Sequence, residues 1–161
     1  MTKIIHLPGS FMPANHGGKE VFVHQLIKQY PGNQSSNIVV IEGNRNELSE
    51  YRFDAIRVIE LPIAKTSNSA KNYFTGISDD LPLFENLLRT ETPDLVHFHD
   101  QGKGASLSHL KVCKSLNIKT LVTYHSPGQS CPQRAMLYKG VAQCDGVLKL
   151  QKCAECRAVV A

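Results

Sequence analysis

The chain has 161 residues, of which 42% are hydrophobic, which is enough for one domain with a substantial core. Its net charge of +4 comes from 18 basic and 14 acidic residues scattered along the chain, a distribution that argues against a nucleic-acid-binding surface. No apolar run approaches the roughly 20 residues that cross a bilayer. We therefore expect a soluble, cytoplasmic protein, with a peripheral contact at the inner membrane face left open.

The first half of the chain predicts strands around one helix. Residues 3–8 form an apolar strand, and residues 37–42 form a second one. Residues 52–63 predict one or two further strands, and the polar segment 64–78 is expected to be a long loop or an irregular helix. Between the first two strands lies an amphipathic helix, with a predicted apolar face of Phe22, Val23, Leu26, Ile27 and Tyr30.

The second half continues the alternation. Asp79-Asp80 is a predicted N-cap for a helix that Thr92-Pro93 ends. A strand at 94–99, a helix at 105–116 and a strand at 118–124 follow. Strands that alternate with helices imply right-handed crossovers, so the expected fold is α/β, with a Rossmann-like, doubly wound and mostly parallel sheet.

Four cysteines lie in the last 31 residues, after this alternation ends, with the spacing C-x12-C-x8-C-x2-C. Four thiolates are the usual shell of a structural Zn²⁺, so we expect a zinc site in a cysteine-rich segment at the C-terminal end. A [4Fe–4S] cluster uses the same ligands and stays open. Disulfides, free thiols and a redox CxxC pair opening a helix at 154–161 are the alternatives, although the N-terminus has no signal peptide to indicate an oxidising compartment. The expected ligands are Cys131, Cys144, Cys153 and Cys156.

A fifth cysteine, Cys113, is separate from this set. It shares the apolar side of the predicted helix at 105–116 with Leu110 and Leu116. We expect it to be a small buried hydrophobic residue.

Ligands of an open α/β sheet gather beyond the carboxyl ends of its strands, and three segments of this chain lie there. In the first, Gly17-Gly18 opens the first helix, where backbone amides and the helix dipole could meet a diphosphate. The spacing is not GxGxxG, and glycines that only turn the chain explain it equally well.

The second segment is His97-Phe98-His99-Asp100. Strand alternation places both histidines on one side and Phe98 on the other. His99 and Asp100, at the strand end, are candidate substrate-binding residues. One histidine is expected to be a hydrogen-bonded core residue, and a metal pair is disfavoured because the sequence places no third ligand beside it.

The third segment is Thr123 to Gly128, in which His125 leaves a strand and leads into the cysteine-rich segment. An imidazole there could bind a sugar hydroxyl and titrate near neutral pH, so His125 is the candidate catalytic residue beside an equally acceptable structural role. A Ser-His-Asp hydrolase fits poorly, since there is no G-x-S-x-G motif.

Read together, three motifs resemble the N-terminal half of family 4 retaining glycosyltransferases, which have the two-domain GT-B architecture. They are HLPGSFMPANHGGKEVFVHQL, PDLVHFHD and TLVTYHSPGQSCPQ, and the cysteines resemble a subset of these enzymes. The resemblance implies transfer of a sugar from a nucleotide diphosphate-sugar to an acceptor hydroxyl with retention. It also implies that Gly17 and Gly18 face the donor diphosphate and that His125 lines the cleft.

The resemblance further implies a domain organisation. Residues 1–126 would be the acceptor-side domain and 127–161 a cysteine-rich segment, while the C-terminal donor-binding domain is absent from this chain, which alone should be inactive. The implied partners are a nucleotide-sugar donor, a carbohydrate or lipid-linked acceptor and that second domain, as in polysaccharide biosynthesis. No catalytic metal is expected, because the sequence has no DxD motif. A non-catalytic sugar- or nucleotide-binding module and a structural or redox zinc module are the alternatives.

Overall fold

The structure is a computed structural model that describes residues 1–29, 35–43, 47–62, 80–100, 105–133 and 135–160. The chain divides into two compact units, Met1–Thr123 and Tyr124–Ala161. The segment 64–78, expected to be a loop or an irregular helix, lies outside the described residues.

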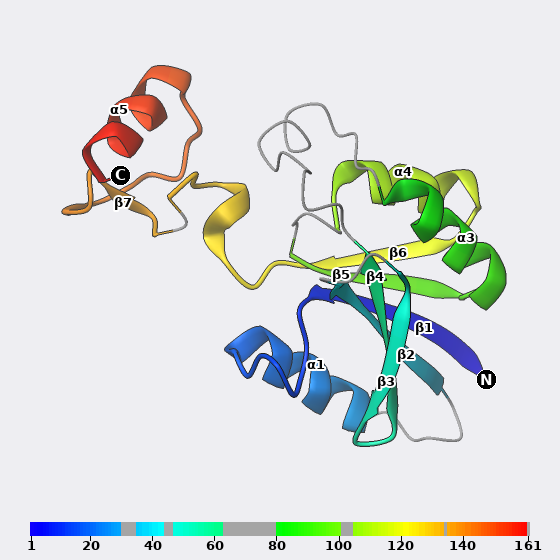
Figure 1. Cartoon of the computed structure of the whole chain (residues 1–161). Helices are drawn as coiled ribbons and strands as arrows, with labels where there is room; N and C mark the ends of the chain where they lie inside the picture. Colours follow the sequence, from blue (N-terminus) through cyan, green and yellow to red (C-terminus); the bar gives the residue numbers. More distant parts are fainter. Residues whose placement is uncertain (30–34, 44–46, 63–79, 101–104, 134, 161) are drawn as a thin grey trace. The chain divides into compact units, whose positions relative to one another are not determined.

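A sheet of six strands forms the centre of the first unit, in the order β3-β4-β2-β1-β5-β6 (Figure 1). All neighbouring strands are parallel except β3 and β4, which form an antiparallel hairpin at one edge. The predicted doubly wound, mostly parallel α/β sheet is therefore confirmed. The strands are β1 (Thr2–Gly9), β2 (Ser35–Gly43), β3 (Ser49–Phe53), β4 (Ile56–Pro62), β5 (Leu95–His99) and β6 (Lys119–Thr123).

Helices cover both faces of this sheet. Helix α1 (Gly18–Gln29) packs on one face, and α3 (Leu81–Glu91) and α4 (Leu107–Ser115) lie side by side on the other (Figure 1). Val23 and Ile27 of the predicted face are buried, but Phe22 is 44% exposed, and Glu20 and His24 are buried instead. The apolar spacing missed this, since both polar side chains are buried by pairing with other polar groups. Tyr30 lies outside the described residues.

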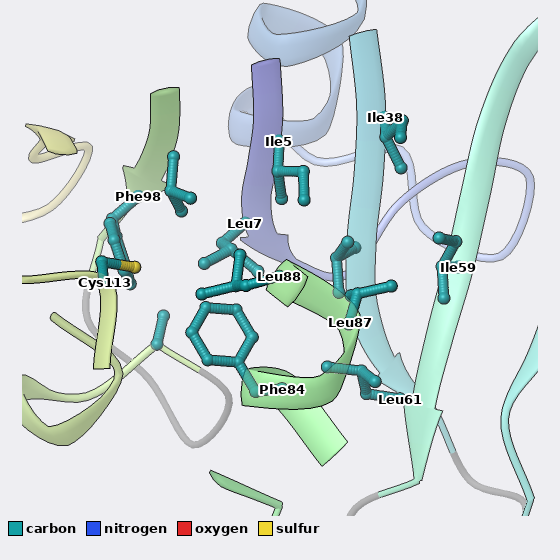
Figure 2. Packing of buried hydrophobic residues seen from close by; sticks show 13 residues of the cluster. Ile5, Leu7, Ile38, Ile59, Leu61, Phe84, Leu87, Leu88, Phe98 and Cys113 are labelled. Atoms are coloured by element: carbon teal, nitrogen blue, oxygen red, sulfur yellow. The ribbon is translucent and has the colours of Figure 1, made fainter. Parts of the chain in front are cut away.

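The larger core lies between the sheet and the α3–α4 layer. Figure 2 shows Phe84 and Leu88 of α3 pointing at Leu7 of β1. Cys113 of α4 packs in the same cluster and is fully buried, as predicted for a small hydrophobic residue. Alternation along β1 and β5 directs apolar residues to this side and histidines to the other.

A second, smaller core lies under α1 and holds the start of the loop after β1. Phe11 is fully buried and makes an edge-on contact with the ring of Phe53, 6.2 Å between centroids. The Tyr51 hydroxyl donates to the Met12 carbonyl oxygen at 2.6 Å. The loop that leads into α1 is thus tied to the β3–β4 hairpin at its first residues.

A buried polar pair links the two helices of the opposite layer. His109 Nε2 of α4 lies 3.0 Å from Asp80 Oδ2, and both side chains are essentially inaccessible. Asp80 is the N-cap residue of α3, as predicted, but its side chain makes no cap hydrogen bond to that helix. Instead, α4 is the capped helix, with Ser106 and His109 forming a reciprocal capping box.

The second unit has little apolar burial. It contains a short 3-10 helix, η1 (Pro127–Gln129), a hairpin of β7 (Leu137–Tyr138) and β8 (Ala142–Gln143), and helix α5 (Leu150–Val160). The hairpin turn places Lys139 and Gly140 at positive φ. Among the described side chains of this unit, only those of Cys131 and Cys156 are buried.

Over the described part of the chain, no helix has both the length and the apolar character that a membrane span requires.

Candidate functional site

The strand order of the first unit marks one crevice as the place for a ligand. Strands β2 and β4 follow β1 to one side, while β5 and β6 lie on its other side, so the topology switches direction between β1 and β5. In open α/β sheets the ligand lies outside the carboxyl ends of the strands at such a point. Here the glycine loop follows β1 and Asp100 follows β5.

The glycine pair lies where the sequence predicted it, at the start of α1. The Gly17 carbonyl accepts the first helical hydrogen bond, from the amide of Val21 at 3.0 Å. The amides of the first turn that follows have no carbonyl partner within the helix, so they are suited to bind an anion. Gly18 is exposed, and a Cβ placed on it would meet nothing within 4 Å.

Gly17 is more constrained than Gly18. A Cβ on Gly17 would lie 2.6 Å from Oε2 of Glu20, a carboxylate that is 6% exposed. The other oxygen of Glu20 accepts a hydrogen bond from the Ser10 hydroxyl at 2.5 Å, which joins the beginning of the loop to the first turn of α1. The two glycines therefore differ: a side chain at 17 disturbs the protein itself, whereas one at 18 projects into open space.

Three histidines gather beneath this crevice, on the sheet face that α1 covers. His6 of β1 is paired in register with His97 of β5, and His99 follows two residues later on the same side. All three are buried, and one ring nitrogen from each lies within 4.8 Å of the others. Among the described residues, this is the group that brings three ligand atoms close enough for one ion. His6 Nδ1 is 3.2 Å from His99 Nε2.

The ring of His6 is oriented by its neighbours on β2. Asn37 Nδ2 donates to the Ser35 hydroxyl at 3.1 Å, which leaves Asn37 Oδ1 facing His6 Nε2 at 3.0 Å. An amide oxygen only accepts, so His6 Nε2 carries the hydrogen and Nδ1 keeps a lone pair. Burial lowers the pKa of His6 below its ordinary value, although the hydrogen bond to Asn37 acts in the opposite direction. The neutral form of His6 is therefore favoured.

Asp100 ends the crevice on the β5 side. Its backbone φ of 69° turns the chain sharply, and its amide donates to the Thr123 carbonyl of β6 at 2.8 Å. His99, its neighbour, is only 1% exposed, so of the two candidate substrate-binding residues Asp100 is the more accessible. Thr123 also lies 2.8 Å from His97 Nε2 through its hydroxyl, which fixes that ring.

A small pocket opens at the carboxyl ends of the neighbouring strands β1, β2 and β4. Two acidic side chains, Glu42 and Asp80, contribute to it beside Gly9 and an apolar floor. The sequence analysis did not single out either residue as part of a site. Glu42 ends a strand in the same way as Asp100, and that signal could have found it. The apolar lining residues are Leu7, Val40, Ile41 and Leu61.

The remaining predicted residues belong to the second unit. His125 is half-buried and follows β6 by two residues. None of the four cysteines forms a disulfide, and all four line one pocket, together with Gln133 and Tyr138. Their sulfurs are not drawn together into a set of ligand atoms as close as that of the histidines.

Two features make the cysteine pocket suitable for thiolates. The backbone N–H of Lys139, in the hairpin turn, donates to Cys156 Sγ at 3.1 Å. Gln133 Nε2 is buried and has no hydrogen-bond partner among the described atoms. The CxxC pair does not open a helix at 154 as proposed for the redox alternative, since α5 begins at Leu150 and contains both Cys153 and Cys156.

The sequence analysis missed His6 as a partner of His97 and His99. A metal site at His97 and His99 was disfavoured because the sequence places no third ligand beside them. Parallel pairing of β1 with β5 supplies that third ligand, His6, which lies 91 residues before His97 in the chain (97 − 6). Only the alternation in the first strand, where His6 interrupts an apolar run, could have drawn attention to it.

Comparison with solved structures gives the fold independent support. The chain is similar to sucrose-phosphate synthase from Thermosynechococcus elongatus, with a TM-score of 0.53 at 17% sequence identity, over 81% of this chain. The chain spans 34% of that enzyme's length. No curated protein sequence matches the chain.

The sequence pattern of Glycosyltransferase Family 4 matches residues 16–154, a range that begins just before the glycine pair and ends within α5. The match covers most of the chain and includes Gly17, Gly18, Asp100 and His125. The chain therefore belongs to Glycosyltransferase Family 4.

Proposed function

We propose that this chain is the acceptor-side part of a retaining glycosyltransferase, which moves a sugar from a nucleotide diphosphate-sugar to an acceptor hydroxyl. The family match carries the general activity. The observation that carries the finer statement is the exposed Gly18 at the start of α1, beside the topological switch point. First-turn amides there would stabilise the negative charge that develops on the departing diphosphate.

The roles of the other residues follow from their positions. Asp100, accessible at the end of β5, would accept hydrogen bonds from hydroxyl groups of a sugar, and the buried His99 would support it from below. His125 would line the cleft near the anomeric carbon and the acceptor. An imidazole can donate to or accept from a hydroxyl near neutral pH, which suits that role.

We propose that Met1–Ser126 is the acceptor-side domain, that 127–161 is a cysteine-rich segment, and that donor binding is completed by a second domain of the full-length protein. The chain covers about a third of sucrose-phosphate synthase, whose fold it shares over that part. The chain by itself should then bind nucleotide-sugars weakly and transfer no sugar.

We propose a structural Zn²⁺ at Cys131, Cys144, Cys153 and Cys156. All four line one pocket, and the described part of the second unit has no apolar core that could order it otherwise. The N–H of Lys139 and the unpaired amide of Gln133 are donors of the kind that stabilise metal-bound thiolates. No catalytic metal is part of this proposal.

The cellular setting is also a proposal. Five cysteines, none of them in a disulfide, suit a reducing compartment, so we place the reaction in the cytoplasm. A lipid-linked acceptor would bring the enzyme to the inner face of a membrane, and polysaccharide biosynthesis is the process that such acceptors serve.

The test is a transfer assay on the full-length protein with a panel of nucleoside diphosphate-sugars and with carbohydrate and lipid-linked acceptors. We expect one donor to be consumed, with release of the nucleoside diphosphate and a product whose anomeric configuration, read by NMR, equals that of the donor. The 161-residue chain assayed beside it should be inactive. Inversion would overturn the retaining mechanism, and turnover by the chain alone would overturn the need for a second domain.

A further inference from the structure

We propose that His6, His97 and His99 form a binding site for a divalent transition-metal ion, separate from the cysteine pocket. Each histidine offers one ring nitrogen, and the three nitrogens lie within 4.8 Å of one another. Neutral imidazole is a ligand that Zn²⁺, Ni²⁺, Cu²⁺ and Fe²⁺ all accept, and Zn²⁺ is the ion chosen for the test.

One pair of nitrogens already has the spacing that a metal requires. Two nitrogens that each bind a tetrahedral zinc at about 2.0–2.1 Å lie roughly 3.3 Å apart. His6 Nδ1 and His99 Nε2 are separated by 3.2 Å. The ligand nitrogen of His97 lies within 4.8 Å of both, so the three nitrogens have to move slightly closer together to bind one ion.

The surroundings of the cluster hold the rings as metal-binding histidines are usually held. Asn37 Oδ1 accepts from His6 Nε2, which leaves the lone pair of Nδ1 directed at His99. Thr123 Oγ1 fixes His97 from β6, so residues from β2 and β6 orient ligands on β1 and β5. Without metal, His99 Nε2–H can donate to His6 Nδ1. Binding would need His99 to move that hydrogen to its other nitrogen, with no net proton release.

The position of the histidine site indicates how a bound ion would affect the protein. The ligands come from β1 and β5, the two strands that flank the topological switch point, and Phe22 of α1 contacts the ring of His99 edge-on at 6.2 Å between centroids. An ion bound here would clamp these strands together beneath the crevice. It is too deeply buried to meet a substrate directly, so its effect would be on the stability of the crevice.

The experiment uses the untagged chain with Cys131, Cys144, Cys153 and Cys156 changed to serine, so that the one remaining thiol is Cys113, which is buried in the core on the other face of the sheet. It is titrated with Zn²⁺ for thermal stability and with Co²⁺ for its visible spectrum. We expect one equivalent to bind, a rise in the melting temperature of roughly 5–10 °C at a hundredfold excess over Kd, and cobalt bands without sulfur-to-metal charge transfer.

Paired variants locate the site. His99→Gln in the same background should abolish the shift and the cobalt bands. His24→Gln, which changes a buried histidine bonded to Asp54 outside the cluster, should leave both unchanged. If His99→Gln does not fold, X-ray absorption of the zinc-loaded parent must show three imidazoles on the metal. No binding by the parent, equal binding by His99→Gln, or a shell with fewer imidazoles would overturn the site.

Metal stoichiometry and ligand type, measured on the unmodified chain, distinguish the histidine site from the cysteine site. The unmodified chain should bind two equivalents, and a single equivalent with only nitrogen and oxygen ligands would remove the cysteine site while leaving the histidine site intact. A single equivalent with four sulfur ligands would support the cysteine site and overturn the histidine site.

Discussion

Two kinds of thiol occur in this chain, and their environments differ. Cys113 is fully buried in the apolar cluster between the sheet and the α3–α4 layer, and burial raises the pKa of its thiol to about 12. The thiolate is the reactive form, so Cys113 should be inert at neutral pH. The other four thiols line a pocket of the second unit.

We predict that Ellman's reagent, applied to the chelator-treated native chain at pH 7.5, modifies four thiols, and that the fifth reacts only in denaturant. Cys113→Ala is the control, since it should remove the fifth thiol without changing the native count. Rapid reaction of five thiols in the folded chain would show that the α4 core is open to solvent.

His125 is the residue whose role depends most on the family. It is half-buried just after β6, where an imidazole can exchange hydrogen bonds with a hydroxyl. We predict that His125→Ala in the full-length protein lowers kcat by on the order of 100-fold while the Kd for the donor changes little. Steady-state kinetics with donor binding by calorimetry check this. An unchanged kcat would leave His125 a structural residue.

At the scale of elements, one charged cluster joins strands and a helix near the amino ends of the strands. Glu91, in the last turn of α3, accepts from Arg57 of β4 at 2.6 Å and from Lys3 of β1 at 3.3 Å. Burial raises the pKa of Glu91, but the hydrogen bonds from Arg57 and Lys3 outweigh it and hold that pKa below its ordinary value of 4.5. The ionised form is therefore the stabilising one.

Because the folded-state pKa is the lower one, Glu91 contributes stability above pH 4.5, and that contribution is lost as the pH falls through the folded-state value. We predict that Glu91→Gln lowers the free energy of unfolding by about 1–2 kcal/mol at pH 7 and by much less at pH 3, measured by urea denaturation. The control is Glu85→Gln, an exposed partner of Arg89 within α3, which should change stability by less than about 0.5 kcal/mol. Equal losses for Glu91→Gln at both pH values would contradict the pairing.

Elements of the first unit follow from the sequence wherever periodicity is strong. The strands and helices around the apolar runs lie where predicted, and the predicted fold is confirmed. Contacts between distant polar residues were not predictable, because nothing local signals them. The side chain of Asp80, the N-cap residue of α3, pairs with His109 and makes no cap hydrogen bond, and His24 and Glu20 are buried on α1 by partners from other segments. The three-histidine cluster depends on strand order in the same way.

At the scale of the whole molecule, the two units differ in the interactions that stabilise each of them internally. The first has two apolar clusters around its sheet, whereas the described part of the second has none. A segment this small needs another source of order, and a metal bound by its cysteines is the one we propose.

We predict that the chain purified under reducing conditions holds one Zn²⁺ at the cysteines, and that Cys131→Ser or Cys156→Ser releases it. Protease sensitivity after Ser126 should then increase, while the circular dichroism of the sheet persists, because the first unit buries its own core. Elemental analysis with limited proteolysis measures both. Cys113→Ser is the matched control and should retain the metal. A tail that stays protected after loss of the metal would rule out this source of order.

We propose that the open space at Gly18 receives the donor diphosphate, and kinetics of Gly18→Val in the full-length protein test this most directly. A Cβ at Gly18 meets nothing within 4 Å, so we expect stability to be preserved, unlike at Gly17, where a Cβ would lie 2.6 Å from Glu20 Oε2. We expect kcat/KM for the donor to fall at least about 10-fold, with an unchanged melting temperature, because a blocked diphosphate loses its amide contacts. Gln25→Val, on the exposed side of α1, should behave as the unmodified enzyme. A Gly18→Val enzyme with normal kcat/KM would contradict the account.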